Sequence, residues 1–264
     1  RVTRTFAVPP ILVQLAKDPI VDHYDLSSLT SIACGAAPLS AELEEAVTAR
    51  IGCRVKQGYG MTEIVPTHFL PDQAPSSKQG SVGVCVANTE SRVIDQETGL
   101  DLGPGQPGEL WHRGPQAMKG YLDQPEATAA TKDADGWIHS GDLGYVDEDG
   151  YFYIIDRLKE LIKYKGHQVA PAELEALLLT HPAVADVAVV RYSDEDAGEI
   201  PKAFVVAREP IDADELMAWV AERVAPYKKI RMVEFIDVIP KSPSGKILRR
   251  ELIARDRAQA AVLV

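Results

Sequence analysis

Residues 136–184 read GWIHSGDLGYVDEDGYFYIIDRLKELIKYKGHQVAPAELEALLLTHPAV, and the character of the sequence changes within this stretch. Tyr151 to Ile155 is a short apolar run that predicts a strand, whereas Pro171 opens a helical pattern that continues to Thr180. The segment between them is basic. We therefore predict a boundary at Asp156 to Lys159, with residues 1–156 in one domain, residues 157–159 as the connection, and residues 160–264 in a second domain.

Upstream of this stretch the sequence predicts an α/β region followed by β structure. Ala41 to Arg50 has helical spacing with Ser40 as a plausible N-cap, and the apolar run Leu29 to Cys34 precedes it. Alternating strands and helices indicate α/β architecture. From Gly80 to Tyr153, short β-type runs are separated by Gly, Pro and Asp, which predicts a small antiparallel sheet or barrel. The runs are Ser91 to Ile94, Glu109 to Arg113 and Tyr151 to Ile155.

Downstream of the boundary, helices and strands alternate over roughly 100 residues, a typical size for a small α+β domain. The predicted helices are Pro171 to Thr180, Asp212 to Val224 and a basic, helix-prone tail from Ile247 to Arg257. The predicted strands are Asp186 to Val190, Lys202 to Ala207 and Met232 to Asp237.

The composition limits the classes of partner. The formal net charge of −11 gives no general electrostatic attraction to nucleic acid or to anionic membranes, so phosphate recognition must be local. No apolar run approaches the roughly 20 residues of a membrane span. Cys34, Cys53 and Cys85 lack the paired spacing of a zinc site or redox dithiol, which favours free thiols and a cytoplasmic location. Without an initiator Met, the chain reads as a fragment.

The segment Gln57-Gly58-Tyr59-Gly60-Met61-Thr62-Glu63 is a candidate nucleotide site. Glycines allow the backbone to approach a ligand closely, and Tyr59 offers a face for a planar base. Thr62 and Glu63 supply hard oxygens suited to phosphate and Mg²⁺. A glycine-rich turn after a strand explains the same spacing.

Asp142 follows Trp137-Ile138-His139-Ser140-Gly141 and is a candidate for binding a ribose diol, because a carboxylate accepts two hydrogen bonds. A turn-forming Asp after Gly is the alternative. His139 could serve as a general base, but it has no visible partner in the sequence, which favours a role in packing or at a strand end.

Two basic elements follow. The segment Asp156 to Val169 carries Arg157, Lys163 and Lys165, which would form a cationic lining for phosphates if they shared a face; a solvated charged surface is the alternative. The loop Pro240-Lys241-Ser242-Pro243-Ser244-Gly245-Lys246 presents a lysine just before Ile247 and Leu248. A single ammonium on such a loop can stabilise phosphoryl and carboxylate oxygens together.

Taken in order, QGYGMTE (57–63), the stretch 136–184 and PKSPSGKILRREL (240–252) resemble the acyl-adenylate-forming superfamily, in particular 4-coumarate–CoA ligases, luciferases and related acyl-CoA ligases. The resemblance implies the C-terminal part of the large AMP-binding domain, with a parallel-sheet segment and a small β-barrel, followed by a small mobile α+β domain. It also implies ATP-dependent conversion of a carboxylic acid to acyl-AMP, followed by transfer to coenzyme A.

The resemblance assigns roles to individual residues. The adenine pocket would comprise Gly35, Ala36, Ala37, Gln57, Gly58, Tyr59 and Gly60, and Met61 would also belong to the AMP/ATP-binding residues. Thr62 would lie near the α-phosphate, Glu63 would bind Mg²⁺, and Asp142 would hold the ribose hydroxyls with support from Arg157. Lys246 would bridge the acyl carboxylate and α-phosphate. Lys163 and Gln168 would complete the site, Lys165 and Gly166 would lie near the pantetheine path, and Lys159 would be the hinge.

The same resemblance leads to further expectations. A lysine acetyltransferase acting on Lys246 would remove the charge that adenylation needs. The family's phosphate-binding loop should lie upstream of residue 1, so we expect the fragment alone to be inactive. Ile64-Val65-Pro66 departs from the Ala-Gly-Pro of many coumarate ligases, which leaves the acid open.

Two other functions fit part of the pattern. The first is an adenylation domain that charges a carrier protein, although the segment Gly166 to Glu173 resembles the CoA-ligase form more closely. The second is a non-catalytic nucleotide-binding module, which would be expected to have lost Lys246, Asp142 or Glu63, whereas all three are present.

Overall fold

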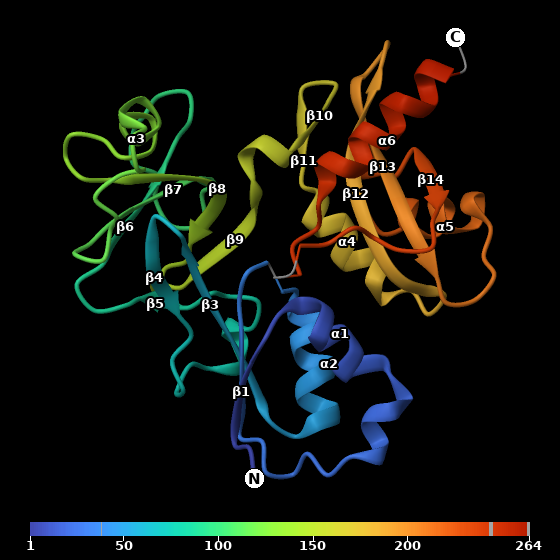
Figure 1. Ribbon diagram of the computed structural model, residues 1–264, viewed down its shortest axis with the longest axis horizontal. Helices are drawn as coiled ribbons and strands as arrows, with labels where there is room; N and C mark the ends of the chain where they lie inside the picture. Colours follow the sequence, from blue (N-terminus) through green and yellow to red (C-terminus); the bar gives the residue numbers. More distant parts are fainter. Residues whose placement is uncertain (38, 243–244, 263–264) are drawn as a thin grey trace. The chain divides into compact units, whose positions relative to one another are not determined.

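The computed structural model describes residues 1–37, 39–242 and 245–262. The chain forms two compact units, Arg1–Leu158 and Lys159–Val264 (Figure 1). The mixed α/β and α+β character expected from the sequence is confirmed. None of the helices within the described ranges is long and apolar enough to cross a membrane.

The first unit begins with a five-stranded sheet of order β1-β2-β3-β4-β5. Strands β1 (Arg4–Ala7), β2 (Ser31–Cys34) and β3 (Arg54–Met61) are parallel neighbours. Strands β4 (Ile64–Phe69) and β5 (Val84–Cys85) continue the sheet in antiparallel fashion. The sheet therefore changes from parallel to antiparallel at β3, the strand that carries the Gln57 motif.

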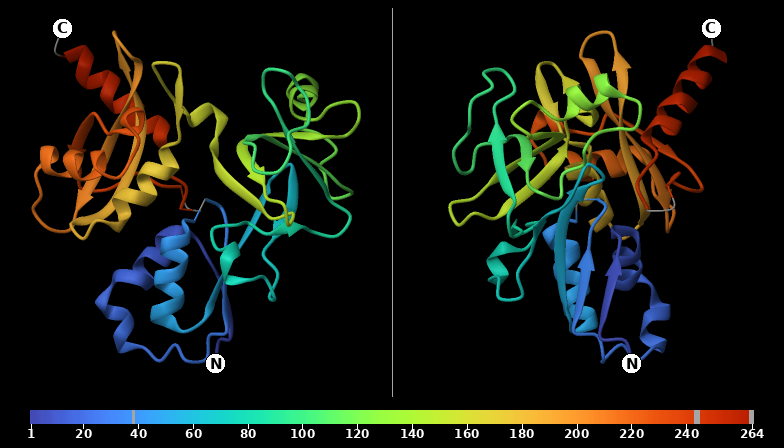
Figure 2. Two further views of the ribbon diagram at one scale, coloured as in Figure 1. Left: turned by 180° about the vertical axis from the view of Figure 1, so that it is seen from behind. Right: turned by 60° about the vertical axis from the view of Figure 1, so that its left-hand side comes forward.

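Helices α1 (Pro9–Lys17) and α2 (Ala41–Ile51) lie side by side against the parallel strands, as the two further views in Figure 2 also show. The Ser40 hydroxyl accepts a 3.3 Å hydrogen bond from the Leu43 amide and caps α2, which confirms the predicted helix start. The shared core contains Leu12, Ile32, Leu39, Val47 and Val55. The 3-10 segments Pro19–His23 and Ser76–Lys78 lie in connections.

The second sheet of this unit has four antiparallel strands in the order β6-β7-β8-β9. Their bounds are β6 (Glu90–Ile94), β7 (Gly108–Arg113), β8 (Ile138–Val146) and β9 (Phe152–Arg157), and helix α3 (Pro125–Thr131) precedes β8. The antiparallel sheet expected from the sequence is confirmed, and within the described ranges no pairing of β6 with β9 closes it into a barrel. An isolated bridge between Gly83 and Phe152 links its β9 edge to the end of the first sheet.

Strand β8 corrects the sequence interpretation of Gly141-Asp142 as a simple turn. Asp142 lies within strand β8, at a bulge. Between the pairs Glu109–Leu143 and Trp111–His139, β8 contains more residues than β7. Gly141 adopts a left-handed φ of 67°, and its amide donates a 2.9 Å hydrogen bond to Glu109 Oε1. The bulge therefore aims the Asp142 side chain while the strand continues.

The second unit contains a sheet of order β11-β10-β13-β12, with β14 pairing in parallel with β13. The strands are β10 (Ile162–Tyr164), β11 (His167–Val169), β12 (Val184–Asp194), β13 (Gly198–Ala207) and β14 (Met232–Phe235). The helices are α4 (Pro171–Thr180), α5 (Ala213–Ala221) and α6 (Arg249–Val262), with 3-10 segments at Leu158–Glu160 and Pro226–Lys228. The predicted bounds of α4 are confirmed.

The first part of β12, residues 184–190, is largely buried on both faces, which explains why it is mostly apolar, whereas the end of the strand is polar and more exposed. Val187 and Val189 join a core with residues of α4 and α5, while Ala188 and Val190 face a second core that includes Leu252 of α6. The helices therefore cover opposite faces of this sheet, α4 and α5 on one and α6 on the other (Figure 1).

Candidate active site

The first group of candidate residues lies at the carboxyl ends of β2 and β3. Cys34 and Gln57 are register partners there, so the turn Gly35 to Ala37, which follows β2, lies beside the Gln57 motif. Ala36 has a left-handed φ of 74°. A Cβ on Gly58 would lie 2.8 Å from the ring of Phe69, so glycine is required for the approach of β4. Carboxyl ends of parallel strands are common ligand-binding positions.

Gln57 supports this turn through its side chain. It is only 3% exposed; its Nε2 donates to the Leu39 carbonyl at 3.1 Å, and its Oε1 accepts from the Leu39 amide at 3.3 Å. Nε2 also lies 3.2 Å from Oε2 of Glu44, which accepts a 3.1 Å bond from the Gly80 amide. The Gln57 side chain is therefore engaged within the protein, and it holds the segment that follows the turn.

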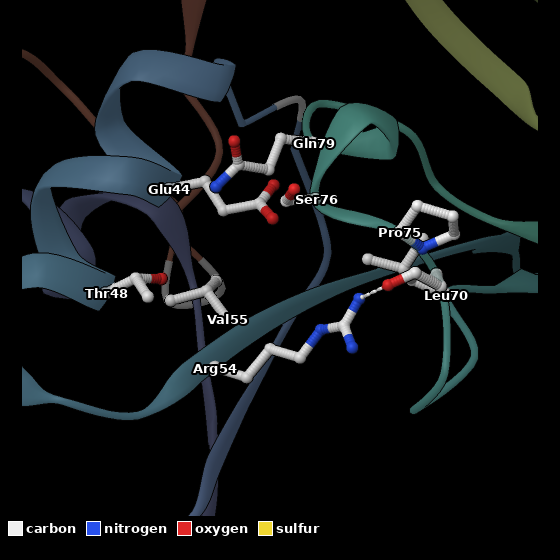
Figure 3. Close-up of a pocket in the computed structure, with 9 residues that line it drawn as sticks. Glu44, Thr48, Arg54, Val55, Leu70, Pro75, Ser76 and Gln79 are labelled. Atoms are coloured by element: carbon white, nitrogen blue, oxygen red, sulfur yellow. Dashed lines mark hydrogen bonds between the residues drawn. The ribbon is translucent and has the colours of Figure 1, made fainter.

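Glu44 was missed as a feature of the site because its position in α2 reads as an ordinary helix residue. Burial raises the pKa of Glu44, against the lowering effect of its hydrogen bonds. Glu44 also borders a cavity of about 190 Å³ next to β3 (Figure 3). None of the predicted nucleotide-binding residues lines this cavity, so it is distinct from the edge where those residues gather. Its lining comprises Glu44, Thr48, Arg54, Val55, Leu70, Ala74, Pro75, Ser76 and Gln79.

Tyr59 and Asp142 come together from the two sheets of the first unit. The Tyr59 hydroxyl donates a 2.5 Å hydrogen bond to Asp142 Oδ2, and Arg157 Nε lies 3.1 Å from Oδ1. Arg157 is the β9 register partner of Asp142. The Ser140 hydroxyl accepts from the Asp142 amide at 3.0 Å. The carboxylate is thus oriented on both oxygens.

The environment of this pair keeps Tyr59 protonated. Burial, reinforced by the charge of Asp142, raises the pKa of Tyr59 well above its usual range, so the phenol acts as a donor near neutral pH. The Asp142 side chain is only 6% exposed, whereas Arg157 is 46% exposed. The arrangement is a carboxylate held in place by a neutral donor and a cation.

Thr62 and Glu63 form the connection between β3 and β4. Glu63 Oε1 accepts a hydrogen bond from the Tyr121 hydroxyl, and the Glu63 carbonyl accepts from the Met118 amide at 2.7 Å. The segment that contains Met118 and Tyr121 therefore fixes the connection. Nothing in the sequence around Tyr121 indicates this long-range contact.

The carboxylate of Glu63 can be compared with the known ways in which proteins hold Mg²⁺. No cluster of three or more His, Cys, Asp or Glu side chains able to hold a metal occurs in the described part of the chain. Mg²⁺ is commonly held by one or two carboxylates together with substrate phosphates and water. A single oriented carboxylate at Glu63 fits that mode, in which most of the ligands come from nucleotide.

In the second unit, β10 and β11 form a hairpin that carries four predicted residues. Lys163 and Gln168 are register partners, so their exposed side chains share one face. Lys165 and Gly166 form the connection, with φ values of 47° and 83° that suit a two-residue hairpin. His167 stacks on Tyr227 with ring centroids 4.5 Å apart. Lys159, the predicted hinge, is the first residue of this unit.

Lys246 is exposed and lies directly before the segment that leads into α6. Pro243 and Ser244 of the predicted loop lie outside the described residues. Among the residues that the structure describes, the Lys246 ammonium has no ion-pair partner. The structure thus brings together Gly35 to Ala37, Gln57 to Glu63, Asp142 and Arg157 in one unit, and places Lys163 to Gln168 and Lys246 in the other.

His139 packs against a neighbouring aromatic ring and also has an acidic partner that the sequence did not reveal. Its ring stacks on Trp111 with centroids 3.8 Å apart, and Nε2 lies 3.4 Å from Asp133 Oδ2. The stacked pair joins β7 to β8.

Comparison with known proteins supplies the class. The AMP-binding enzyme family matches residues 1–122, and the AMP-binding enzyme C-terminal domain matches residues 173–246. The chain belongs to the family of acyl-adenylate-forming, AMP-binding enzymes.

Within that family, particular relatives can be named. The chain is 52% identical over 260 residues to a 4-coumarate–CoA ligase of Vanilla planifolia, covering 96% of this chain and 47% of that protein. It is also 52% identical over 263 residues to 4-coumarate–CoA ligase 2 of Oryza sativa subsp. japonica, covering 97% and 46% of the two chains. The chain therefore spans about half the length of these relatives.

A solved structure agrees with the fold. The anthranilate CoA ligase AuaEII, in complex with anthranoyl-AMP, superposes with a TM-score of 0.88 at 29% identity, covering 98% of this chain and 51% of that one. The architecture of both units is therefore that of an adenylate-forming enzyme.

Proposed function

We propose that the protein containing this chain is an AMP-forming acid–thiol ligase that activates a carboxylic acid with ATP and transfers the acyl group to coenzyme A. The oriented carboxylate of Asp142, held by Tyr59 and Arg157, is the observation that carries the proposal. The names of the two plant relatives and the acyl-adenylate in the anthranilate ligase support it.

The proposed chemistry has two steps and needs no covalent protein nucleophile. In the first, a substrate carboxylate oxygen attacks the α-phosphorus of ATP, forming the acyl-phosphate bond and releasing pyrophosphate. In the second, the sulfur of deprotonated coenzyme A attacks the acyl carbon, and AMP leaves with the electrons of the broken carbon–oxygen bond. Both steps depend on alignment and on stabilising negative charge.

We assign the first-unit residues to nucleotide binding. Asp142 accepts hydrogen bonds from the ribose hydroxyls, and the turn Gly35 to Ala37 with the Gly58-Tyr59-Gly60 segment borders adenine. Thr62 contacts the α-phosphate. Glu63 provides the protein carboxylate for Mg²⁺, which when bound neutralises phosphate charge.

We assign the second-unit residues to the reacting groups. Lys246 supplies a fixed cation to the acyl carboxylate and α-phosphate during adenylation, which suits its exposed position. Lys163 and Gln168 serve the same site, Lys165 and Gly166 border the pantetheine path, and Lys159 serves as the hinge. Acetylation of Lys246 would remove its charge and switch adenylation off.

The test uses the full-length protein with a panel of aromatic, cinnamic and medium-chain acids, and measures AMP release with and without coenzyme A. Acid- and coenzyme-A-dependent AMP release supports the proposal; transfer of the acyl group only to a carrier protein would overturn it.

Asp142→Ala should abolish tight binding of a non-hydrolysable acyl-adenylate analogue. Asp149→Ala, which alters an exposed carboxylate in the same unit, is the matched control. Equal, weak binding by wild type and Asp142→Ala would favour a non-catalytic module.

A further inference from the structure

Hydrogen bonds join the residues before and after the Lys246 loop to each other. The Ser242 amide donates to the Lys246 carbonyl at 2.8 Å, and the Lys246 amide donates to the Ser242 hydroxyl at 3.1 Å. The Leu248 amide donates to the Pro240 carbonyl at 2.9 Å, and Lys241 and Ile247 form a bridge. The backbone of Lys246 is therefore fixed relative to the two ends of its loop.

The end of the loop nearer α6 is fixed by a buried charged pair. Arg249 Nη2 lies 2.6 and 2.7 Å from the two carboxylate oxygens of Glu175, which is 8% exposed. Arg249 Nε donates to the Val189 carbonyl at 3.2 Å, and the Val189 amide donates to Glu175 Oε1 at 2.8 Å. One guanidinium thus joins α6 to both α4 and β12, three positions after Lys246.

The other end is fixed to the same strand. Lys241 Nζ lies 2.6 Å from Asp186 Oδ2, and both side chains are partly buried. Asp186 and Val189 both belong to the largely buried first part of β12. The chain is therefore attached to this strand on both sides of Lys246, while Lys246 itself is exposed.

We propose that Glu175 and Arg249, assisted by Asp186 and Lys241, are positioning residues that set the location of the Lys246 ammonium for adenylation. This inference rests on the role proposed above for Lys246. Glu175 and Arg249 themselves touch neither substrate nor nucleotide in this proposal. Their effect passes through the backbone of residues 245–249, which joins Arg249 to Lys246, and the hydrogen bonds between Ser242 and Lys246 hold that backbone in place.

The two half-reactions separate this role from general stability. Adenylation is measured in the full-length protein by acid-dependent exchange of pyrophosphate into ATP. Thioester formation is measured separately with chemically prepared acyl-AMP and coenzyme A. A misplacement of about 1 Å can lower a rate by roughly 100-fold. Glu175→Gln should therefore lower adenylation by about 10- to 100-fold and leave thioester formation within roughly twofold of wild type.

Three further variants sharpen the test. Arg249→Lys keeps the charge but cannot reproduce the planar guanidinium that bonds Glu175 and the Val189 carbonyl together, so it should reproduce the selective loss in adenylation. Asp186→Asn tests the other end of the loop if Glu175→Gln fails to fold. Glu173→Gln lies on the same helix but pairs with Lys228 at the surface, with 48% of its side chain exposed, and should leave both half-reactions unchanged.

A double-mutant comparison shows whether Glu175 acts through Lys246. Once Lys246→Ala has removed the ammonium, adding Glu175→Gln should cause no further loss of adenylation. Equal losses in both half-reactions, or a further loss in the Lys246→Ala background, would overturn the inference. If Lys246→Ala leaves adenylation intact, the proposed role of Lys246 fails. If only Lys246→Ala impairs adenylation and Glu175→Gln does not, the positioning inference alone fails.

Discussion

The hydroxyl of Tyr59 donates a hydrogen bond of 2.5 Å to Oδ2 of Asp142, across 83 positions of sequence. This bond joins β3, at the edge of the parallel strands, to β8 of the antiparallel sheet. The bond also couples the aromatic residue assigned to the adenine pocket to the carboxylate assigned to ribose. A substitution of one of these residues should therefore change the position of the other.

Removing the Tyr59 hydroxyl should weaken nucleotide binding. Tyr59→Phe keeps the ring but removes one donor to a nearly buried carboxylate, and a hydrogen bond to a charged group contributes about 1.5–3 kcal/mol. We expect ATP affinity to fall by roughly 10- to 100-fold, measured by titration calorimetry on the full-length protein. Tyr145→Phe, on β8, is the control, and unchanged affinity of Tyr59→Phe would contradict the coupling.

Tyr121 should influence the dependence on Mg²⁺. Its hydroxyl orients Glu63, and loss of a residue that orients a metal-binding carboxylate typically lowers metal affinity or activity by about 10- to 100-fold. Tyr121→Phe should therefore need at least about tenfold more Mg²⁺ for half-maximal adenylation. The exposed Tyr24→Phe serves as the comparison, and identical Mg²⁺ titrations for Tyr121→Phe and wild type would rule out this role.

Two buried histidines should make the first unit sensitive to acid. Burial, with a smaller effect of His112, lowers the pKa of His68 from 6.5 to about 3, and burial lowers that of His112 to about 4. Their stabilising contribution is complete above pH 6.5 and is lost as the pH falls toward these values, because the unfolded chain binds the protons first. By pH 5 the loss should be roughly 2 kcal/mol for each histidine.

The measurement is the free energy of unfolding as a function of pH in denaturant titrations. His68→Leu should flatten the decline between pH 6.5 and 5, whatever its effect on stability at neutral pH. The exposed His23→Gln should leave the slope unchanged. A slope for His68→Leu as steep as that of wild type would argue against the linkage.

In the second unit, Lys202 should be essential to the attachment of α6. Its ammonium lies 2.6 Å from Asp256 and 2.7 Å from Glu234, and Lys202 and Asp256 are at most 6% exposed. Burial opposes the charge, but the hydrogen bonds to Asp256 and Glu234 outweigh it and raise the pKa of Lys202. Lys202→Ala leaves a buried carboxylate uncompensated and should destabilise the unit by about 3–5 kcal/mol.

Thermal and denaturant unfolding of the full-length protein test this expectation. Replacing both partners, as Lys202→Met with Asp256→Leu, should restore much of the lost stability because no buried charge then lacks a partner. Lys228→Ala disrupts a more exposed pair and should change stability by less than about 1 kcal/mol. Equal effects of Lys202→Ala and Lys228→Ala would be inconsistent with a buried, structurally required pair.

Local signals in the sequence identify several elements well. Ser40 caps α2, and Pro171 begins α4, because these residues act through their own backbone neighbourhood. Strand β8 escaped detection because Gly141 and Gly144 resemble turn residues. In the structure Gly144 serves close packing instead, since a Cβ there would lie 2.5 Å from the Tyr153 carbonyl.

The candidate residues could be identified from motif order, but their partners could not. Tyr59 with Asp142, Glu63 with Tyr121, and Glu175 with Arg249 are each separated by more than 50 positions. Such contacts depend on how strands and helices pack, and neither spacing nor composition encodes them in a single sequence. The side chain of Gln57 illustrates the limit, because the motif placed it beside a base and the structure engages it with Leu39.

The connection of β12 to β13 bears on the order in which the second unit folds. These strands form an antiparallel hairpin whose connection is organised by Asp194, which accepts hydrogen bonds from the amides of Asp196 and Ala197. Closing a short loop between two strands costs little conformational entropy, so this hairpin can form early in folding. Helix α6 is distant in sequence, so we expect it to dock onto this hairpin afterwards. Arg249 and Lys241 join the chain on either side of Lys246 to α4 and β12, so we expect the position of Lys246 to become fixed only after α6 has docked.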